Sequence, residues 1–471
     1  MKLNSAGDDF IARLRKCLPK ESFREITESY LEEPRGQLTG RAGLVVAPGS
    51  VGDVSLIVKA AIEYRVPIIP YGGGTGLVGG QIMPDGPAPV ILSLERLRKI
   101  RGVYPADNVI EVEAGAILAD VQSAAASVGK LFPLSIAARG SARIGGILAT
   151  NAGGVNVLRY GNARELCLGL EAVLPDGSIW NGMKRLRKDN MGYDLRNLLI
   201  GSEGTLGVIT SAALKLSPIP ANSATALLAV RNPACALDIL SLASDQFCDG
   251  VNAFELMKST SLEFIAEAFP EMKRPFADPP DWFVLVDVGL AKGIDPAESF
   301  EKLYLDSHAR GFCYDGLVSH SEAQRREFWA IREIIPEANR RIGAICSHDI
   351  SVPLGSIAEF IESSDVAMAA LGTYRINCFG HLGDGNLHFN IFPPKGENRN
   401  RYLGERGVIT QCIHDLVHGF GGSVGAEHGV GRLKIGDLER YADPSGLSAM
   451  RAIKTALDPA GIMNPGAVFR M

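Results

Sequence analysis

A chain of 471 residues suggests two to three domains, and 46% hydrophobic with 21% charged residues is ordinary for a soluble globular protein. The net charge of -5 gives no reason to expect nucleic acid or an anionic membrane surface as a partner. The eight cysteines include no Cys-x-x-Cys pair, which excludes zinc-ribbon and iron–sulfur spacings.

In chain order, residues 1–40 are predicted to form a polar, helical N-terminal segment. Residues 41–220 predict a mixed α/β domain, with strands at 44–48, 66–70 and 109–113 and helices at 51–64 and 117–127. Ser50 and Asp53 resemble a capping box at the start of the first of these helices. Pro218 and Pro220 interrupt both helix and strand, so a domain boundary is expected at this point.

Residues 221–420 are predicted to form a second, α+β domain. Long amphipathic stretches at 234–247, 321–341 and 356–371 alternate there with strands such as the one that starts at Trp282. Residues 421–471 are glycine-rich at first and then predict one helix before Asn464-Pro-Gly. The first residues lack an apolar signal core, no apolar run is long enough to cross a bilayer, and scattered thiols fit a reducing compartment. A cytoplasmic protein is expected, with peripheral membrane attachment left open.

The glycine-rich stretch 70–80 is the first chemical feature, because glycines let backbone N–H groups surround a phosphate. Residues 74–79 match the dinucleotide fingerprint, but the prolines that follow cannot form the helix that a Rossmann NAD site requires. The absence of Gly-Lys-Ser/Thr excludes a P-loop, and a long flexible turn stays an alternative. Segments 140–154 and 200–210 are loops of the same character, and three such loops favour an extended ligand.

These three segments, in this order, resemble the FAD domain of the vanillyl-alcohol oxidase and p-cresol methylhydroxylase superfamily. Segments 186–196 (LRKDNMGYDLR) and 201–207 (GSEGTLG) are similar to the D-2-hydroxyglutarate dehydrogenases and their D-lactate- and glycolate-oxidising relatives. The resemblance extends from about residue 40 to the C-terminus. It implies an α+β protein with a two-part FAD-binding domain, a substrate (cap) domain that carries a metal site, and a C-terminal segment, 421–471, that returns to the FAD domain and completes the active site.

By this resemblance, loop 72–76 holds the pyrophosphate, 141–154 line the isoalloxazine, 203–209 reach the adenosine side, and Asn464 returns to the flavin. The residues assigned to the cofactor are Gly72, Gly73, Gly74, Thr75, Gly76, Leu77, Ser141, Gly145, Gly146, Thr150, Asn151, Gly153, Gly154, Glu203, Gly204, Gly207, Ile209 and Asn464. Every histidine lies at or beyond position 308, so no histidyl bond can form from the phosphate loop. Noncovalent FAD is therefore expected.

Four polar residues in two glycine-rich motifs form the second chemical feature. His381 and His388 lie in segment 380–390, where a turn followed by a strand can bring both imidazoles together, and Glu427 and His428 lie in segment 425–431. Two imidazoles and a carboxylate with open positions are typical of a catalytic metal, for which zinc, manganese and iron(II) all fit. Asp384 is a further candidate ligand, whereas His308, His320, His414 and His418 have helix-like surroundings. The residues alone leave it open whether the two motifs form one site.

The resemblance implies that His381, His388 and Glu427 bind the metal, with zinc expected first, and that His428 is the general base. It further implies that Arg332 holds the substrate carboxylate and that Asn390 faces the substrate. The expected reaction is oxidation of a D-2-hydroxy acid, such as D-2-hydroxyglutarate, to the 2-keto acid by hydride transfer to flavin N5. The electrons would pass to an unidentified electron-transfer protein or quinone, and a homodimer is left open.

Three alternatives remain: a D-lactate or glycolate dehydrogenase, a non-catalytic flavin-binding subunit of a larger oxidase complex, and a metal-dependent hydrolase without flavin. Two positions depart from the 2-hydroxyglutarate enzymes. Ser347 stands where those enzymes usually have a carboxylate-binding lysine, and Pro336 replaces a threonine four residues after Arg332. His348, Arg340 or Arg341 could supply the missing cation. These departures put 2-hydroxyglutarate itself in question.

Overall fold

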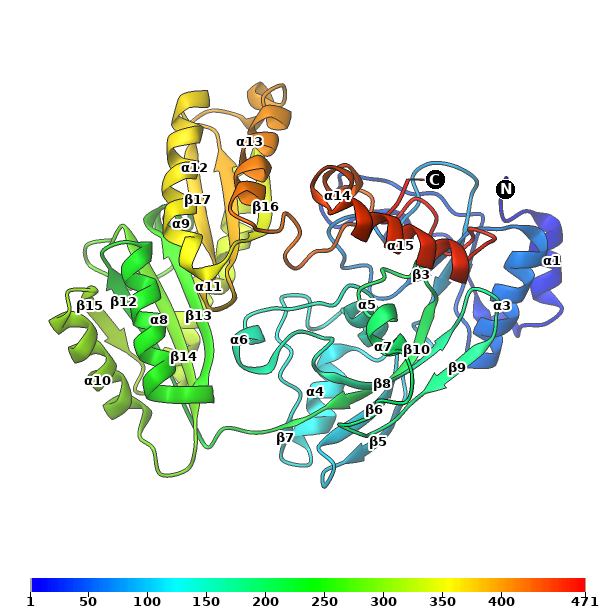
Figure 1. Cartoon of the computed structure of the whole chain (residues 1–471), viewed down its shortest axis with the longest axis horizontal. Helices are drawn as coiled ribbons and strands as arrows, with labels where there is room; N and C mark the ends of the chain where they lie inside the picture. Colours follow the sequence, from blue (N-terminus) through cyan, green and yellow to red (C-terminus); the bar gives the residue numbers. More distant parts are fainter. Residues whose placement is uncertain (1, 471) are drawn as a thin grey trace. The chain divides into compact units, whose positions relative to one another are not determined.

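The computed structural model describes residues 2–470, which form two compact units (Figure 1). The first unit contains the residues through Gly153, Gly161–Ile219, and the residues from Glu427 onward. The second unit contains Gly154–Tyr160 and Pro220–Ala426. Within residues 2–470, no helix is long and apolar enough to cross a membrane.

The first unit contains a four-stranded sheet in the order β1-β2-β4-β3, in which β2, β4 and β3 are parallel and β1 is antiparallel. Its strands are β1 Phe23–Arg24, β2 Leu44–Val46, β3 Ile68–Tyr71 and β4 Val90–Ser93. Helix α3, Val51–Tyr64, connects β2 to β3, and the side chain of Ser50 accepts a hydrogen bond from the Asp53 N–H at 3.1 Å. The predicted strands, helix and cap in this region are confirmed.

A second sheet of the first unit is antiparallel, in the order β5-β6-β10-β8-β9, and β7 pairs with β11. The strands are β5 Ile100–Tyr104, β6 Val109–Glu113, β7 Lys130–Leu131, β8 Cys167–Val173, β9 Ile179–Gly182, β10 Val208–Lys215 and β11 Ser217–Pro218. The remaining helices are α1 Asp8–Arg15, η1 Lys20–Ser22, α2 Glu28–Leu31, α4 Leu118–Ala126, α5 Ile144–Ala149, α7 Leu195–Leu199, α14 Ile435–Tyr441 and α15 Pro444–Leu457.

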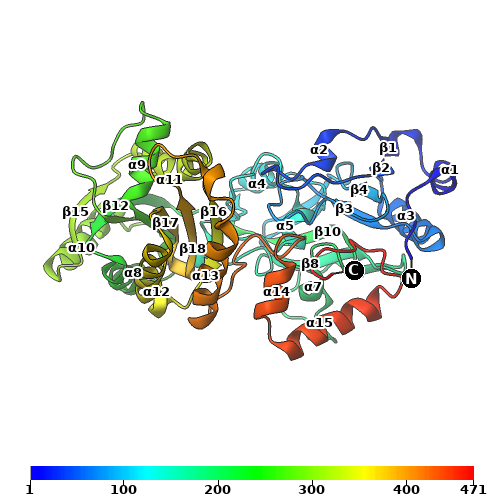
Figure 2. The ribbon, with the colours of Figure 1, turned by 90° about the horizontal axis from the view of Figure 1, so that it is seen from above.

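Three predictions for this unit need correction. The N-terminal segment is only partly helical, because Phe23 and Arg24 pair with β2 as a strand. Segment 140–154 contains helix α5 rather than a continuous loop: its Gly145 allows close packing, since a Cβ there would lie 2.8 Å from the Cβ of Ala114. The C-terminal segment forms two helices, α14 and α15, where one was predicted (Figure 2). Gly436 lowers the helix propensity of the α14 segment, so the sequence pattern did not indicate this helix.

The second unit is built on one seven-stranded sheet in the order β15-β12-β14-β13-β17-β18-β16, in which every neighbouring pair is antiparallel. Its strands are β12 Asn222–Val230, β13 Val251–Lys258, β14 Trp282–Leu290, β15 Cys313–Val318, β16 Cys346–Ser351, β17 Arg375–His381 and β18 Asn386–Phe392. Strand β14, an inner strand of this sheet, is buried along its whole length, because helices cover both faces of the sheet.

One face of this sheet packs against α8, α10, α12 and α13, and the other packs against α9 and α11 (Figure 2). The helices of the unit are α6 Val157–Tyr160, α8 Pro233–Phe247, η2 Cys248–Gly250, α9 Ser259–Ala268, α10 Pro296–Ala309, α11 Glu322–Ile342, η3 Leu354–Ser356, α12 Ile357–Leu371, η4 Leu382–Asp384, η5 Arg399–Tyr402 and α13 Arg406–Gly419. The three long helices predicted here are confirmed to within one residue at each end. His308, His414 and His418 lie in helices as expected, but His320 precedes α11, where its N–H donates to Gln324.

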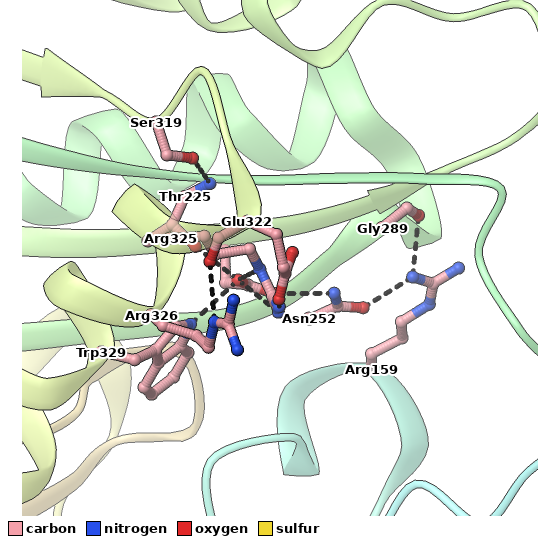
Figure 3. A network of polar contacts seen from close by, with 10 residues as sticks. Arg159, Thr225, Asn252, Gly289, Ser319, Glu322, Arg325, Arg326 and Trp329 are labelled. Carbon is pink, nitrogen blue, oxygen red and sulfur yellow. Dashed lines mark hydrogen bonds and ion pairs between the residues drawn. The ribbon is translucent and has the colours of Figure 1, made fainter.

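A buried carboxylate on the α11 side of β14 organises part of this face. Asp287 accepts hydrogen bonds from Thr225 Oγ1 at 2.6 Å, Asn252 Nδ2 at 2.8 Å, Arg325 Nε at 2.9 Å and Trp329 Nε1 at 3.0 Å. Figure 3 shows this network, in which the Asn252 carbonyl also accepts a hydrogen bond from Arg159 of α6 at 2.6 Å. The network therefore fixes α6 and α11 to the sheet.

Candidate active site

The glycine-rich loop directly follows β3, as predicted, and no helix starts in it. Within residues 2–470, no hydrogen bond to protein uses the N–H groups of residues 73–78. The loop carbonyls are engaged instead, because Gln81 Nε2 donates to Gly76 O at 2.7 Å and to Gly74 O at 3.4 Å. This half-buried loop therefore has backbone N–H groups available to donate, while two of its carbonyls are bound by Gln81. Such a loop fits the phosphates of a dinucleotide such as FAD.

The second predicted segment packs directly on this loop. A Cβ at Gly73 would clash with the carbonyl oxygen of Ser141, and one at Gly72 would lie 3.2 Å from the Cα of Gly146. The two backbones therefore approach closely only because glycine stands at these positions. Thr75 and Leu77 lie in the same loop, half-buried.

The rest of the second segment serves mainly its own structure. The Thr150 hydroxyl donates to Gly146 O at 3.0 Å, and the Asn151 carbonyl accepts from the Arg164 N–H at 2.9 Å. Gly153 is buried in the first unit, whereas Gly154 is the first residue of the second unit.

The third segment and the C-terminus are joined by a network inside the first unit. The Glu203 carboxylate accepts hydrogen bonds from the N–H groups of Val430 and Gly431, each at 2.8 Å. Burial raises the pKa of Glu203, an effect that these two hydrogen bonds oppose. Asn464 Nδ2 donates to Gly80 O and to Glu203 O, each at 2.8 Å. Glu203 and Asn464 thus connect the loops, and their side-chain atoms are engaged with protein rather than directed to a cofactor.

Three further cofactor candidates accompany this network. Gly204 lies beside Pro70, Gly207 precedes β10, and Ile209 is buried on β10. The structure therefore places the three predicted loops, except for Gly154, and Asn464 in the same unit.

The two histidines of segment 380–390 lie on a hairpin formed by β17, the short helix η4 and β18. His381 ends β17 and His388 lies on β18, and their rings meet edge to face with centroids 5.5 Å apart. The Asp384 carboxylate accepts from the Asn386 N–H at 3.1 Å and so serves the turn. Burial raises the pKa of Asp384, which belongs to neither of the carboxylate and histidine clusters found among the described residues.

Glu427 and His428 follow directly on Ala426, whose N–H contacts the carbonyl of Asp349 on β16 at 3.4 Å. One ligand atom each from His381, His388 and Glu427 lies within 4.8 Å of the others. A second such group joins Asp349 with Glu427 and His428. Two imidazoles and one carboxylate at these separations form a donor set that fits a catalytic divalent metal.

Two carboxylates that contact these histidines were not selected as site residues from the sequence. Glu255 on β13 is fully buried, and its Oε1 lies 2.6 Å from His381 Nδ1. Asp349 Oδ1 lies 3.8 Å from His388 Nδ1 and accepts a hydrogen bond from Asn386 Nδ2 at 3.0 Å. The only sequence indication of Glu255 was that it is the only acid in a strand of mostly apolar residues.

The candidate substrate residues lie on the same face of the sheet. Arg332 on α11 donates from Nε to Glu255 Oε2 at 2.6 Å, and its guanidinium lies 4.8 Å from the Phe379 ring centroid. Burial raises the pKa of the Glu255 carboxyl, but Arg332 and His381 outweigh burial and hold that pKa at about 2. Asn390 is buried on β18, directly opposite Ser347 of β16. One face of the sheet therefore combines the two candidate metal-binding histidines, a buried cation and a buried amide.

Comparison with known proteins gives the family of this chain. Residues 42–182 match the family described as "FAD binding domain", and residues 219–468 match "FAD linked oxidases, C-terminal domain". A D-2-hydroxyglutarate dehydrogenase of Xanthomonas citri is 35% identical over 90% of this chain and 89% of its own length. A putative mitochondrial D-lactate dehydrogenase of Schizosaccharomyces pombe is 31% identical over 90% of this chain and 81% of its own.

The solved structure of p-cresol methylhydroxylase with substrate bound is similar in fold. Its TM-score is 0.73 at 16% identity, over 98% of this chain and 96% of that one. The expected α+β fold with an FAD-binding domain of this type is thereby confirmed. By its two matching regions and by the relatives that share most of its length, the chain belongs to the FAD-linked oxidase family.

Proposed function

We propose that this protein is an FAD-dependent dehydrogenase that oxidises the C2 hydroxyl of a D-2-hydroxy acid to a ketone, with the help of a divalent metal. The observation that carries the proposal is the cluster of His381, His388 and Glu427, whose two histidines lie on the sheet face that packs against α11 and its buried Arg332. D-2-hydroxyglutarate is the first substrate to test, because the Xanthomonas relative is named for it.

In this proposal His381, His388 and Glu427 hold the metal, which would lower the pKa of a coordinated substrate hydroxyl. His428 accepts the hydroxyl proton as general base. Arg332 binds the C1 carboxylate, and Asn390 donates a hydrogen bond that orients the substrate. These groups fix the substrate while C2 gives up its hydrogen.

When bound, the flavin supplies the two-electron acceptor that takes the C2 hydride. The loops at 72–77, 141–154 and 203–209 would hold it noncovalently, and Asn464 would keep the C-terminal segment against them. The product is the 2-keto acid, and the electrons would leave to an electron-transfer protein or a quinone. Location in the cytoplasm and assembly as a homodimer stay predictions.

One observation favours a second candidate, a dehydrogenase for monocarboxylic D-2-hydroxy acids such as D-lactate. Ser347 lies at the exposed position opposite Asn390, where a cation for a second carboxylate was expected. The adjacent His348 points to the other face of the sheet, where its Nδ1 lies 3.2 Å from Nε2 of the buried His414.

The two arginines that could replace a lysine are engaged elsewhere. Arg340 donates twice to Glu337, at 2.7 and 2.6 Å, on an exposed part of α11. Arg341 donates to Ala268 O at 3.0 Å and lies 3.9 Å from the Phe269 ring centroid. None of these residues therefore offers a cation for a second substrate carboxylate. In this proposal Arg332 alone binds a carboxylate, which suits a monocarboxylic acid.

A substrate panel decides between these candidates. The purified protein is assayed with an artificial dye acceptor against both hands of 2-hydroxyglutarate and lactate, with and without a metal chelator. Oxidation of the D-acids alone, lost on chelation, supports the proposal, and the ratio of kcat/KM for the two acids selects the substrate class. A flavin-bearing protein that oxidises none of them would instead support a non-catalytic subunit, and absence of flavin absorbance would favour a metal-dependent hydrolase.

A further inference from the structure

The proposed roles leave one buried charge unexplained, the carboxylate of Glu255. We infer that Glu255 is a positioning residue that fixes both the candidate metal ligand His381 and the candidate substrate-binding Arg332 through its two oxygens. The inference rests on the proposed function. It adds a residue that the sequence motifs do not single out.

The backbone places these three residues in contact. Glu255 on β13 pairs directly with His381 on β17 in the antiparallel ladder, and Arg332 reaches the same carboxylate from α11. Oε1 contacts His381 Nδ1 and Oε2 contacts Arg332 Nε, each at 2.6 Å. Because the carboxylate is fully buried, no solvent replaces either partner.

For His381, the contact selects one tautomer. A carboxylate that accepts from Nδ1 keeps the proton on that nitrogen, so Nε2 is the atom with a lone pair to offer to a metal. A carboxylate behind a ligating imidazole also fixes the orientation of the ring. Glu255 thereby prepares the ligand before a metal binds.

For Arg332, the contact with Glu255 determines which nitrogens of the guanidinium are available to bind the substrate. Glu255 occupies Nε, and within residues 2–470 the terminal nitrogens of Arg332 make no hydrogen bond to protein. Two terminal nitrogens on a planar group can bind a substrate carboxylate in a bidentate manner. The Phe379 ring beneath the guanidinium restricts its rotation further.

Asp287 offers a matched control on the neighbouring strand. It is also a buried carboxylate that holds an arginine of α11, but its partners Arg325, Thr225 and Trp329 include no candidate ligand or substrate residue. Substitution of either residue removes a buried carboxylate and should lower stability. Only substitution of Glu255 should also disturb the geometry of the candidate site.

The test compares Glu255→Gln with Asp287→Asn in the FAD-containing protein. After removal of metal, Zn²⁺ and Mn²⁺ affinities are measured by competition with a chelator, and KM is measured for the oxidised acid. The glutamine amide can accept from one partner but presents N–H groups to the other. Zn²⁺ should therefore bind about 10- to 100-fold more weakly, and KM should rise, whereas Asp287→Asn should keep wild-type Zn²⁺ affinity. Wild-type Zn²⁺ affinity and KM in Glu255→Gln would overturn the inference.

If Glu255→Gln fails to retain FAD or fold, Glu255→Asp decides, because it keeps the charge but is one methylene too short to contact both partners. Weaker Zn²⁺ binding by this variant supports the inference, and unchanged binding overturns it. The Zn²⁺ titration needs no substrate, so it is separate from the proposed function. If the wild-type protein binds Zn²⁺ but oxidises no 2-hydroxy acid, the proposed function is wrong. The effect of Glu255 on Zn²⁺ affinity through His381 can still be measured.

Discussion

Helix α11 carries four arginines that each contact a carboxylate, and three of these pairs show how the surroundings differ. Arg325 and Asp287 lie in a buried network with Thr225 and Trp329. Arg332 and Glu255 lie in a buried network with His381. Arg340 and Glu337 form an exposed pair. The chemistry of the pair is the same in each case, so its role is decided by burial and by the third partner.

Of these regions, we expect the one around Glu255 to determine catalytic activity. Loss of the metal should have the largest effect on kcat/KM. We expect chelation, or His388→Ala, to lower kcat/KM on the order of 10³-fold or more, because several kcal/mol of charge stabilisation are lost. FAD should stay bound, since its loops lie in the first unit. Elemental analysis and flavin absorbance check this, and normal turnover by metal-free protein would remove the metal from the mechanism.

The next largest effect is expected at His428, which the proposal assigns to proton removal. His428→Ala should slow flavin reduction by substrate about 10²- to 10⁴-fold in single turnover, because one general base contributes that much. Metal and FAD content should be unchanged. Reoxidation of chemically reduced protein provides the internal control, since it needs no deprotonation of substrate. Loss of metal from this variant would instead identify His428 as a ligand.

Asp287→Asn should have the opposite profile, with a loss of stability rather than of chemistry. The substitution removes the charge that Arg325 pairs with in a buried site, which should cost about 3 kcal/mol in the free energy of unfolding. Urea unfolding followed by circular dichroism measures this loss. The KM and metal affinity of the folded variant should match the wild type, and a changed KM would show that the two networks are coupled.

The exposed pair should give the smallest effect. Arg340→Gln should leave the melting temperature and kcat/KM for D-lactate unchanged, because an exposed ion pair contributes little. The same variant tests whether Arg340 binds the second carboxylate of 2-hydroxyglutarate. A raised KM for 2-hydroxyglutarate alone would show that Arg340 supplies the cation missing at Ser347.

Features that depend on local pattern could be predicted from the sequence. The cap at Ser50, three strands of the first unit (β2, β3 and β6) and the long helices of the second follow from turn chemistry and periodicity, which act over a few residues. The hairpin of His381 and His388 was predicted for the same reason. Helices α5 and α14 were missed because their glycines indicated loops, whereas in α5 Gly145 permits close packing.

The sequence by itself determined the glycine-rich loops, the two histidine-containing motifs and the family resemblance. It could not separate Glu255 from Asp287, because each is the only acid in a strand of mostly apolar residues. Only the tertiary structure decided that Glu255 meets Arg332, 77 residues away, and His381, 126 residues away, whereas Asp287 meets neither. The physical reason is that burial predicts that a carboxylate must have partners, but the sheet register and the helix above it choose which partners these are.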